Sequence, residues 1–232
     1  MCHPPGSPTL GTVHDNSTLV SFGFYLGGGD LSPSCVVPSS GWVDAMTTEG
    51  WTLIPTWVGR QPSCGDGDYK ISTDDTTAGS QGVMEADDAV YTALTLDIGS
   101  GAIIYNDIEG ANGWTSCPGD DDNVLAYLNG WDSEIHRLGF LSGYYSSASY
   151  NMAAASTVSH VPDDIWFADY NSNTGTFGDP YISDSLWSGK RIHQFNGTHN
   201  ATLGGVVLSV DSDCIHGQAT GAVVPSQSCS YF

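Results

Sequence analysis

Two carboxylates at the end of an apolar segment are the residues best suited to chemistry. Residues 102–109 begin as a hydrophobic run and end in Asp107 and Glu109, with one isoleucine between them. Side chains alternate between the two faces of a strand, so Tyr105, Asp107 and Glu109 are expected on one face and Ile108 on the other. Like charges this close raise one another's pKa, which suits one proton donor beside one anion. The alternative interpretation is an acidic pair in a surface loop that follows a strand.

Such a pair can cleave a glycosidic bond. One carboxylic acid protonates the leaving oxygen, and a second carboxylate stabilises the oxocarbenium-like state or activates water. We interpret Glu109 as the general acid, with Asp107 or Asp213 as its partner. Retention or inversion of configuration depends on the carboxyl separation, about 5–5.5 Å against about 6.5–9.5 Å, and both outcomes stay open at this point.

Strand and helix patterns alternate along the chain and must position these acids. Strands are expected at 19–26, 51–58, 102–109, 139–145, 165–170, 191–195 and 205–211. Helices are expected at 9–14, 38–49, 80–96 and 123–138, with a short helix near 149–158. This alternation, with the chain length, predicts a TIM-type (β/α)8 barrel that forms a single domain over residues 1–232. Because a complete barrel has one strand more than these, the first strand is expected to be missing or truncated at the N-terminus.

In such a barrel the carboxyl ends of the strands meet at one rim. The sequence places acids and aromatic side chains at these ends, and such groups accept hydrogen bonds from sugar hydroxyls and stack on sugar rings. The predicted substrate-binding residues are Tyr25, Trp57, Tyr145, Asp169, His193, Gln194 and Asp211. For each aromatic residue alone, core packing is the alternative interpretation.

Other chemistries lack their sequence patterns. The chain has no GxSxG, HExxH or GxGxxG motif, so a serine hydrolase, a zinc protease and a dinucleotide-binding enzyme are not expected. Asp120, Asp121 and Asp122 begin an amphipathic helix, where they complement the helix dipole rather than form a calcium site. The sequence therefore predicts neither a metal nor a cofactor.

The composition is strongly acidic, with 26 Asp and Glu residues against 5 Lys and Arg, a formal net charge of −21. Such a surface repels polyphosphates, so nucleic acid is not expected as a partner. No apolar run approaches about 18 residues, so no membrane span is expected. Charged residues of both signs together make up only 13% of the chain, and Gly, Ser and Thr are frequent. This composition suits a secreted protein with a neutral ligand, although solubility alone explains it equally well.

The cysteines predict an oxidising compartment and hence a secreted, extracellular protein. The chain has 6 Cys with no CxxC spacing, which favours disulfides over zinc. We propose the pairs Cys2–Cys35, Cys64–Cys117 and Cys214–Cys229, of which the last staples the C-terminal tail from about residue 214 onto itself. Glycosylation sequons at Asn16, Asn196 and Asn200 make a glycoprotein an additional hypothesis.

Several ordered segments resemble a known family. They are Phe-Tyr-Leu-Gly-Gly at 24–28, Leu-Ile-Pro-Thr-Trp-Val-Gly at 53–59, Ile-Tyr-Asn-Asp-Ile-Glu at 104–109, Gly-Tyr-Tyr-Ser-Ser at 143–147, Asp-Asp-Ile-Trp-Phe-Ala at 163–168, Arg-Ile-His-Gln-Phe at 191–195 and Val-Asp-Ser-Asp at 210–213. Together they resemble a secreted glycoside-hydrolase-like domain family formerly of unknown function, and are similar to the Chalaropsis-type lysozyme barrels. The resemblance implies a TIM-type barrel with its site at Asp107, Glu109, Asp211 and Asp213, and cell-wall sugar polymers as the substrate class. It also implies an Asp on a first strand before Cys2, which this sequence lacks.

Three hypotheses follow for the function. The first is a secreted glycoside hydrolase that acts on cell-wall or other extracellular polysaccharide or oligosaccharide. The second is a carbohydrate-binding barrel that has kept the cleft and lost turnover. The third is a structural module that self-assembles outside the cell, in which a neighbouring chain supplies the missing strand.

Overall fold

The computed structural model describes residues 2–65, 67–109, 120–150, 152–171, 173–217 and 224–231, with residues 120, 121, 217 and 224–231 as backbone only. The helices are α1 (Ser7–Asp15), α2 (Ser40–Glu49), α3 (Asp75–Thr95), α4 (Asp120–Arg137) and the short 3-10 helix η2 (Met152–Thr157). The strands are β1 (Ser21–Gly27), β2 (Thr52–Trp57), β3 (Ile103–Asp107), β4 (Leu141–Ser147), β5 (Asp164–Ala168), β6 (Lys190–Leu203), β7 (Val206–Gly217) and β8 (Val224–Tyr231).

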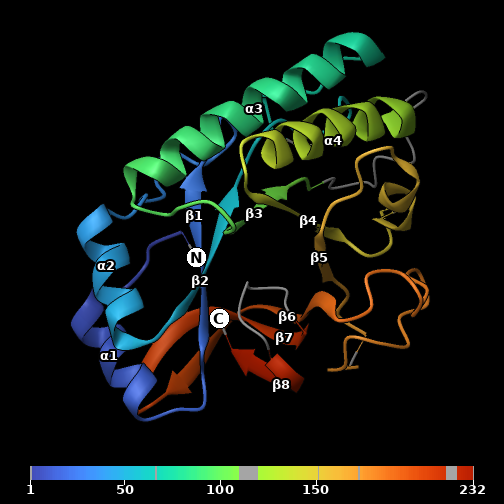
Figure 1. Ribbon diagram of the computed structural model, residues 1–232. Helices are drawn as coiled ribbons and strands as arrows, with labels where there is room; N and C mark the ends of the chain where they lie inside the picture. The colour runs from blue at the N-terminus through green and yellow to red at the C-terminus, as the bar shows by residue number, and fades with distance from the viewer. Residues whose placement is uncertain are drawn as a thin grey trace.

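The described strands form one 8-stranded sheet in chain order from β1 to β8. Strands β1 to β6 pair in parallel, whereas β7 is antiparallel to both β6 and β8. Figure 1 shows this sheet curled around a central space, with the four α-helices on its outer side. No pairing joins β8 to β1 among the described residues. The architecture is therefore a mixed α/β, barrel-like sheet.

The β6–β7 hairpin departs from the predicted repetition of strand and helix. Gly204 and Gly205, with positive φ angles of 55° and 83°, connect the two strands directly. Glycine adopts such angles without steric cost, and two of them in succession form the tight turn of an antiparallel hairpin. The segment predicted as a stapled tail contributes a further strand, β8, to the same sheet. The last two strands in the chain, β7 and β8, are thus paired in antiparallel fashion, which corrects the expectation of parallel strands throughout.

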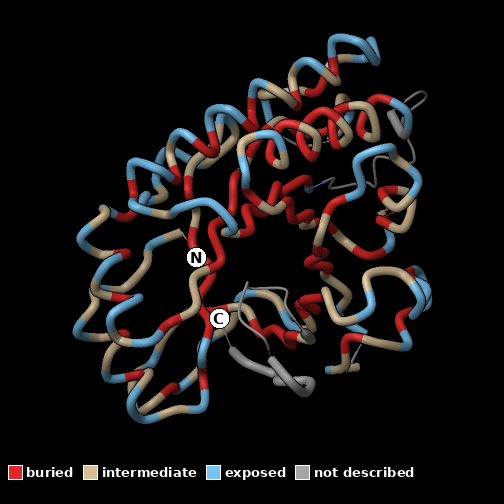
Figure 2. The backbone as a smooth tube through the Cα atoms, viewed as in Figure 1, coloured by how far each residue is buried: buried red, intermediate tan, exposed pale blue. Residues whose placement is uncertain are grey.

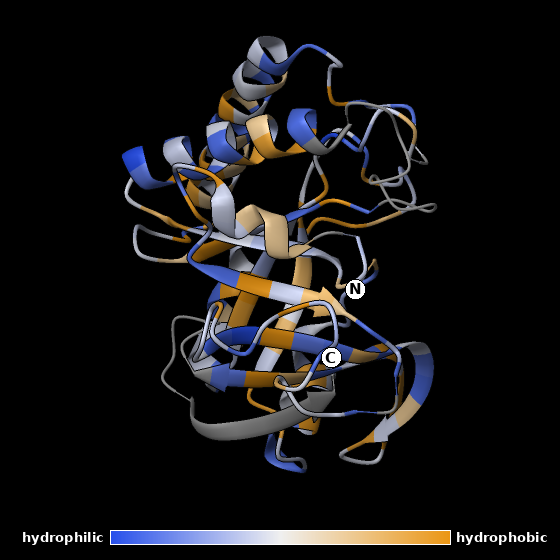
Figure 3. Cartoon of the chain, turned by 90° about the vertical axis from the view of Figure 1, so that its right-hand side faces the viewer, coloured by the Kyte–Doolittle hydropathy of each residue, from blue (hydrophilic) through white to orange (hydrophobic). Residues whose placement is uncertain are grey.

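Alternation along the strands separates two apolar layers. Ile104 and Ile108 face the helices and belong to the clusters that these form with the outer side of the sheet. A separate cluster lies on the inner side of the sheet and consists of Ile54, Ile103, Tyr105, Trp166, Ile192 and Ile215. Figure 2 shows buried residues along the strands around the centre, and Figure 3 shows hydrophobic and hydrophilic residues alternating along several strands. The predicted alternation on either side of Tyr105 is confirmed.

The helices begin and end at residues with clear local causes. Ser39 caps α2 by accepting a hydrogen bond from the Trp42 amide, and Gly50 ends it at φ 99°. Helix α3 begins at Asp75, earlier than the predicted residue 80, because Asp74 accepts from the Thr77 amide at 2.9 Å and so caps an additional turn. No described helix combines the length and apolar character that a membrane span requires.

Candidate active site

Two adjoining cavities open at the carboxyl ends of the parallel strands. Their volumes are about 720 Å³ and about 190 Å³. Residues of β1, β3, β4 and the segment after β5 line both cavities: Tyr25, Asp107, Glu109, Tyr145 and Tyr170. The strand ends therefore converge on one rim and bring together most of the residues that were selected from the sequence.

Gln61 holds the last residue of β3, Asp107, and the residue two positions further on, Glu109. Its side-chain amide donates to the Asp107 carbonyl at 2.9 Å, and its side-chain oxygen accepts from the Glu109 amide at 2.6 Å. The backbones of β2 and β3 pair only at Thr56–Tyr105 and Trp57–Asn106, so the buried Gln61 side chain continues the ladder beyond the last pair. This arrangement fixes where Glu109 leaves the strand.

Asp107 and Glu109 have different environments. Asp107 is buried, and its Oδ1 has no hydrogen-bond partner among the described residues. Burial and then the charge of Glu109 raise its pKa well above the ordinary value. Glu109 is exposed within the cavities, and its pKa is raised by loss of solvent and then by the charge of Asp211. A raised pKa favours the protonated form that a general acid needs.

Asp211 and Asp213 lie two residues apart on β7 and occupy different depths. Asp211 lines the smaller cavity and accepts a hydrogen bond from Thr198 at 2.9 Å. Asp213 is completely buried, lines neither cavity, and accepts from the Trp166 indole at 2.6 Å. Burial raises the pKa of Asp213 well above its ordinary value, which favours the neutral acid. Of the two residues, Asp211 is the carboxylate that faces the cavity.

Tyrosine hydroxyls and a glutamine lie beside the acids, since Tyr145 on β4 pairs with Asp107 on β3. Tyr145 and Tyr170 both donate to the Gln194 side-chain oxygen, at 3.0 Å and 2.9 Å. The Trp166 ring meets the Tyr145 ring edge-on, with centroids 5.0 Å apart. Burial, followed by the charges of Asp107, Glu109 and Asp211, raises the pKa of Tyr25, so this phenol stays a hydrogen-bond donor.

Trp57 and His193 face away from the cavities. The Trp57 indole donates to Glu85 on α3 at 2.8 Å, and neither cavity includes Trp57. The two ring nitrogens of His193 lie 2.6 Å and 2.8 Å from backbone carbonyl oxygens of residues 175 and 169, and the ring stacks on Phe167. Both side chains therefore support the fold around the site rather than line it. Asp169 lines the larger cavity, and burial and the neighbouring Asp179 raise its pKa.

Several residues of the cavity walls are not among those predicted from the sequence. They are Asp30, Thr56, Tyr150, Trp166 and Thr198. Strand alternation could have found two of them: Thr56 shares the inner face of β2 with Ile54, and Trp166 is an inner residue of β5. The hydrogen bonds between Gln61 and residues 107 and 109 had no comparable signal, because these partners lie 46 and 48 residues away in the sequence.

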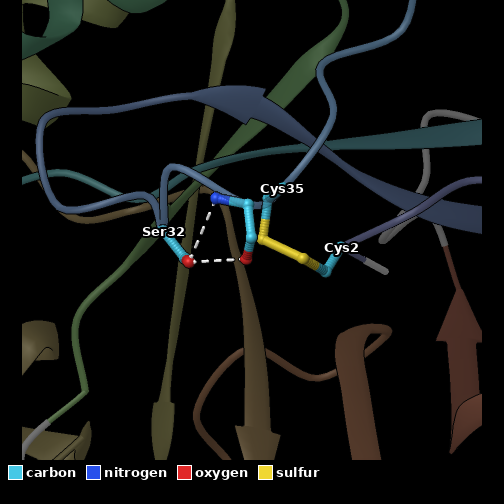
Figure 4. Close-up of a disulfide and its surroundings, with 4 residues drawn as sticks. Cys2, Ser32 and Cys35 are labelled. Atoms are coloured by element: carbon cyan, nitrogen blue, oxygen red, sulfur yellow. Dashed lines mark hydrogen bonds between the residues drawn. A yellow bond between two sulfur atoms is a disulfide. The ribbon is translucent and has the colours of Figure 1, made fainter.

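The structure contains the disulfide Cys2–Cys35, which Figure 4 shows. Cys35 lines the larger cavity. Cys64 and Cys214 are also in disulfides, and the β7–β8 register places Cys214 opposite Cys229. Cys117 lies outside the described residues. The sequon residues Asn16, Asn196 and Asn200 are exposed. Within the described residues, no group of three or more His, Cys, Asp or Glu side chains is arranged to hold a metal.

A curled α/β sheet with acids and aromatic residues at its carboxyl rim defines a glycoside-hydrolase-like domain. The chain belongs to the Rv2525c-like, glycoside hydrolase-like domain family, whose sequence model matches residues 15–215. This confirms the family that the sequence motifs indicated. No curated protein matches the chain.

Solved structures of similar fold include proteins from two bacteria. The Mycobacterium tuberculosis Tat-secreted protein Rv2525c in complex with HEPES shares 16% identity over 84% of both chains, with a TM-score of 0.57. The same protein in complex with L-tartrate shares 17% identity over 83% of both chains, with a TM-score of 0.56. An uncharacterized B. stearothermophilus protein shares 16% identity over 85% of this chain and 84% of its own, with a TM-score of 0.53. At these identities the likeness is one of fold.

Proposed function

We propose that this chain is a secreted glycoside hydrolase that cleaves an extracellular polysaccharide, with Glu109 as the general acid. The observation that carries the proposal is the position of Glu109: it is a carboxyl group with a raised pKa, exposed in a cavity at the rim. Membership of a glycoside hydrolase-like family supports the same chemistry. The disulfide, and the Tat-secreted relative Rv2525c, support secretion.

The reaction assigns different roles to the acids. Glu109 gives its proton to the glycosidic oxygen as the bond to the anomeric carbon breaks. Asp211, which faces the same cavity, stabilises the positive charge on the sugar ring. Water then supplies the new hydroxyl group, and its released proton returns to the Glu109 carboxylate. Asp107 and Asp213 are supporting residues, because burial favours their neutral forms and a neutral acid is a poor nucleophile.

The tyrosines of the rim bind the sugar in this proposal. Tyr25, Tyr145 and Tyr170 present ring faces and hydroxyl groups to the shared part of the two cavities. We also propose that residues 1–232 act as one TIM-type barrel domain, since the sheet runs in unbroken chain order and the site lies at the rim expected for that fold.

The test compares wild type with Glu109→Gln on a panel of cell-wall polysaccharides, with released reducing ends as the readout. We expect Glu109→Gln to lower the rate about 10²–10⁴-fold, the usual contribution of a general acid. Asp44→Asn, a neutralised acid on the exposed side of α2, serves as the control and keeps the wild-type rate. Equal release of reducing ends by wild type and Glu109→Gln would remove Glu109 from the mechanism.

A carbohydrate-binding barrel without turnover is the second candidate. It is favoured by the burial of Asp107, since an acid held in its neutral form takes no part in nucleophilic attack. This candidate predicts that wild type retains oligosaccharides on an affinity column and releases no product.

A further inference from the structure

Every charged side chain among the described residues that line the two cavities is acidic. The acids that line the two cavities are Asp30, Asp107, Glu109, Asp169 and Asp211. No Lys, Arg or His is among the described residues that line either cavity. A neutral sugar needs few carboxylates for recognition, and crowding like charges around one hollow opposes their ionisation. The walls are therefore complementary to a ligand that brings positive charge.

Asp107 provides a second, independent indication of a missing ligand group. Its exposed fraction is 4%, it lines both cavities, and its Oδ1 has no hydrogen-bond partner among the described residues. Buried polar atoms are normally satisfied, so such an oxygen requires an explanation. A donor on a bound ligand would supply the absent hydrogen bond.

The shape and lining of the cavities indicate what kind of cation fits. A bare metal ion is not favoured, because the described residues hold no group of three or more potential ligands in metal-binding arrangement. The larger cavity has a volume of about 720 Å³, which is room for more than one sugar ring. Tyr25, Tyr145 and Tyr170 offer aromatic faces to ring C–H groups and to a nearby cation. An ammonium group carries three donors and no acceptor, which matches an acidic wall.

We propose that the site binds a polysaccharide bearing free amino groups, such as a polymer of de-N-acetylated hexosamine. This inference rests on the proposed function, because it names the class of sugar for the same site. The amino-sugar ligand differs from the neutral ligand expected from the composition. The reason is that the acids of the cavity, unlike those of the outer surface, surround one volume. Polymers of uronic acids or sugar phosphates are repelled by the same walls.

The experiment measures binding by isothermal titration calorimetry with three oligomers at one pH and low salt: a glucosamine tetramer, an N-acetylglucosamine tetramer and a tetragalacturonate. Product formation is followed separately by chromatography. We expect the glucosamine tetramer to bind wild type about tenfold or more tightly than its N-acetylated counterpart, with an advantage that falls as salt rises. Tetragalacturonate binds most weakly.

Paired variants distinguish the cavity from the acidic surface. Asp169→Asn/Asp211→Asn neutralises two cavity acids, and Asp44→Asn/Asp88→Asn removes the same charge from exposed sites on α2 and α3. The first variant loses most of the preference for the glucosamine tetramer, and the second keeps it. Thermal unfolding of both variants, and their affinity for the N-acetylated tetramer, show whether the cavity is intact.

Each outcome decides one of the two proposals. Equal or tighter binding of the N-acetylated tetramer, or the same loss in both double variants, overturns the amino-sugar inference even if product forms. A clear preference without product supports the inference and favours the carbohydrate-binding barrel over the hydrolase. Binding of neither oligomer refutes the amino-sugar site.

Discussion

Replacing Gln61 by leucine tests how far activity depends on the position of Glu109, because the Glu109 side chain itself is unchanged. The substitution removes three hydrogen bonds: to the Asp107 carbonyl at 2.9 Å, to the Gly59 carbonyl at 3.3 Å, and from the Glu109 amide at 2.6 Å. A buried group left without its partner costs about 1–3 kcal/mol, and the Glu109 amide, which lies near solvent, falls at the low end. The free energy of unfolding should therefore fall by about 2–4 kcal/mol.

The same change should reduce activity beyond its effect on stability. A displacement of a catalytic group by about 1 Å costs about 10²-fold in rate, so kcat should fall by about that factor while KM changes little. Release of the segment would also move Glu109 toward solvent and away from Asp211, weakening both causes of its raised pKa. The alkaline limb of the kcat–pH profile should then shift to lower pH.

Gln81→Leu is the matched control. Gln81 on α3 also holds a loop, because its side-chain oxygen accepts from the Ser72 amide at 2.7 Å, but it lines neither cavity. We expect this variant to lose stability and keep the wild-type kcat and pH profile. If Gln61→Leu also kept both, or if the two variants lost activity in equal measure, the positioning argument would be refuted.

Three further predictions concern stability. Burial raises the pKa of Asp164 from 3.8 to about 7, so the folded state holds this proton more tightly than the unfolded chain, and stability is lost as pH rises from about 4 to about 7. Asp164→Asn should remove that loss, at most about 4 kcal/mol. An equal fall in the free energy of unfolding of both proteins over this pH range would contradict the prediction. A Cβ on Gly130 would lie 2.1 Å from the Gly79 carbonyl oxygen, so Gly130→Ala should force α4 away from α3. We expect the free energy of unfolding, measured by denaturant titration, to fall by about 1–3 kcal/mol. Gly99→Ala is the control and should cost far less, because a Cβ there meets nothing within 4 Å. Replacing Cys2 and Cys35 by serine opens a disulfide between residues 33 positions apart. The free energy of unfolding should fall by about 3–4 kcal/mol, because the closed loop restricts the unfolded chain. An unchanged Tm would show that the loop restricts the unfolded chain very little.

The parts of the site that follow strict alternation could be predicted from the sequence. Asp107 shares the inner face of β3 with Tyr105 because the strand is regular and its isoleucines face the helices. The same rule would have excluded His193, since Ile192 and Gln194 are the inner residues of β6. Selecting residues by their position at a strand end, without their parity, placed Trp57 and His193 on the wrong side.

Other features depend on contacts that local patterns do not encode. Two successive glycines, Gly204 and Gly205, indicate a hairpin turn, and the structure has one there. The expectation of repeated strand–helix units was wrong at this point of the chain. Gln61 acts on residues far away in the sequence, so only the folded chain shows that it continues the β2–β3 ladder. The different depths of Asp211 and Asp213 likewise follow from how β7 lies in the curled sheet.

The most direct test of the account is a crystal structure of Glu109→Gln with an uncleaved oligosaccharide. The account predicts a glycosidic oxygen within about 3 Å of the residue 109 side chain, with sugar rings against Tyr25, Tyr145 and Tyr170. Sugar bound at another surface, or bound in these cavities with every glycosidic oxygen out of reach of residue 109, would contradict it.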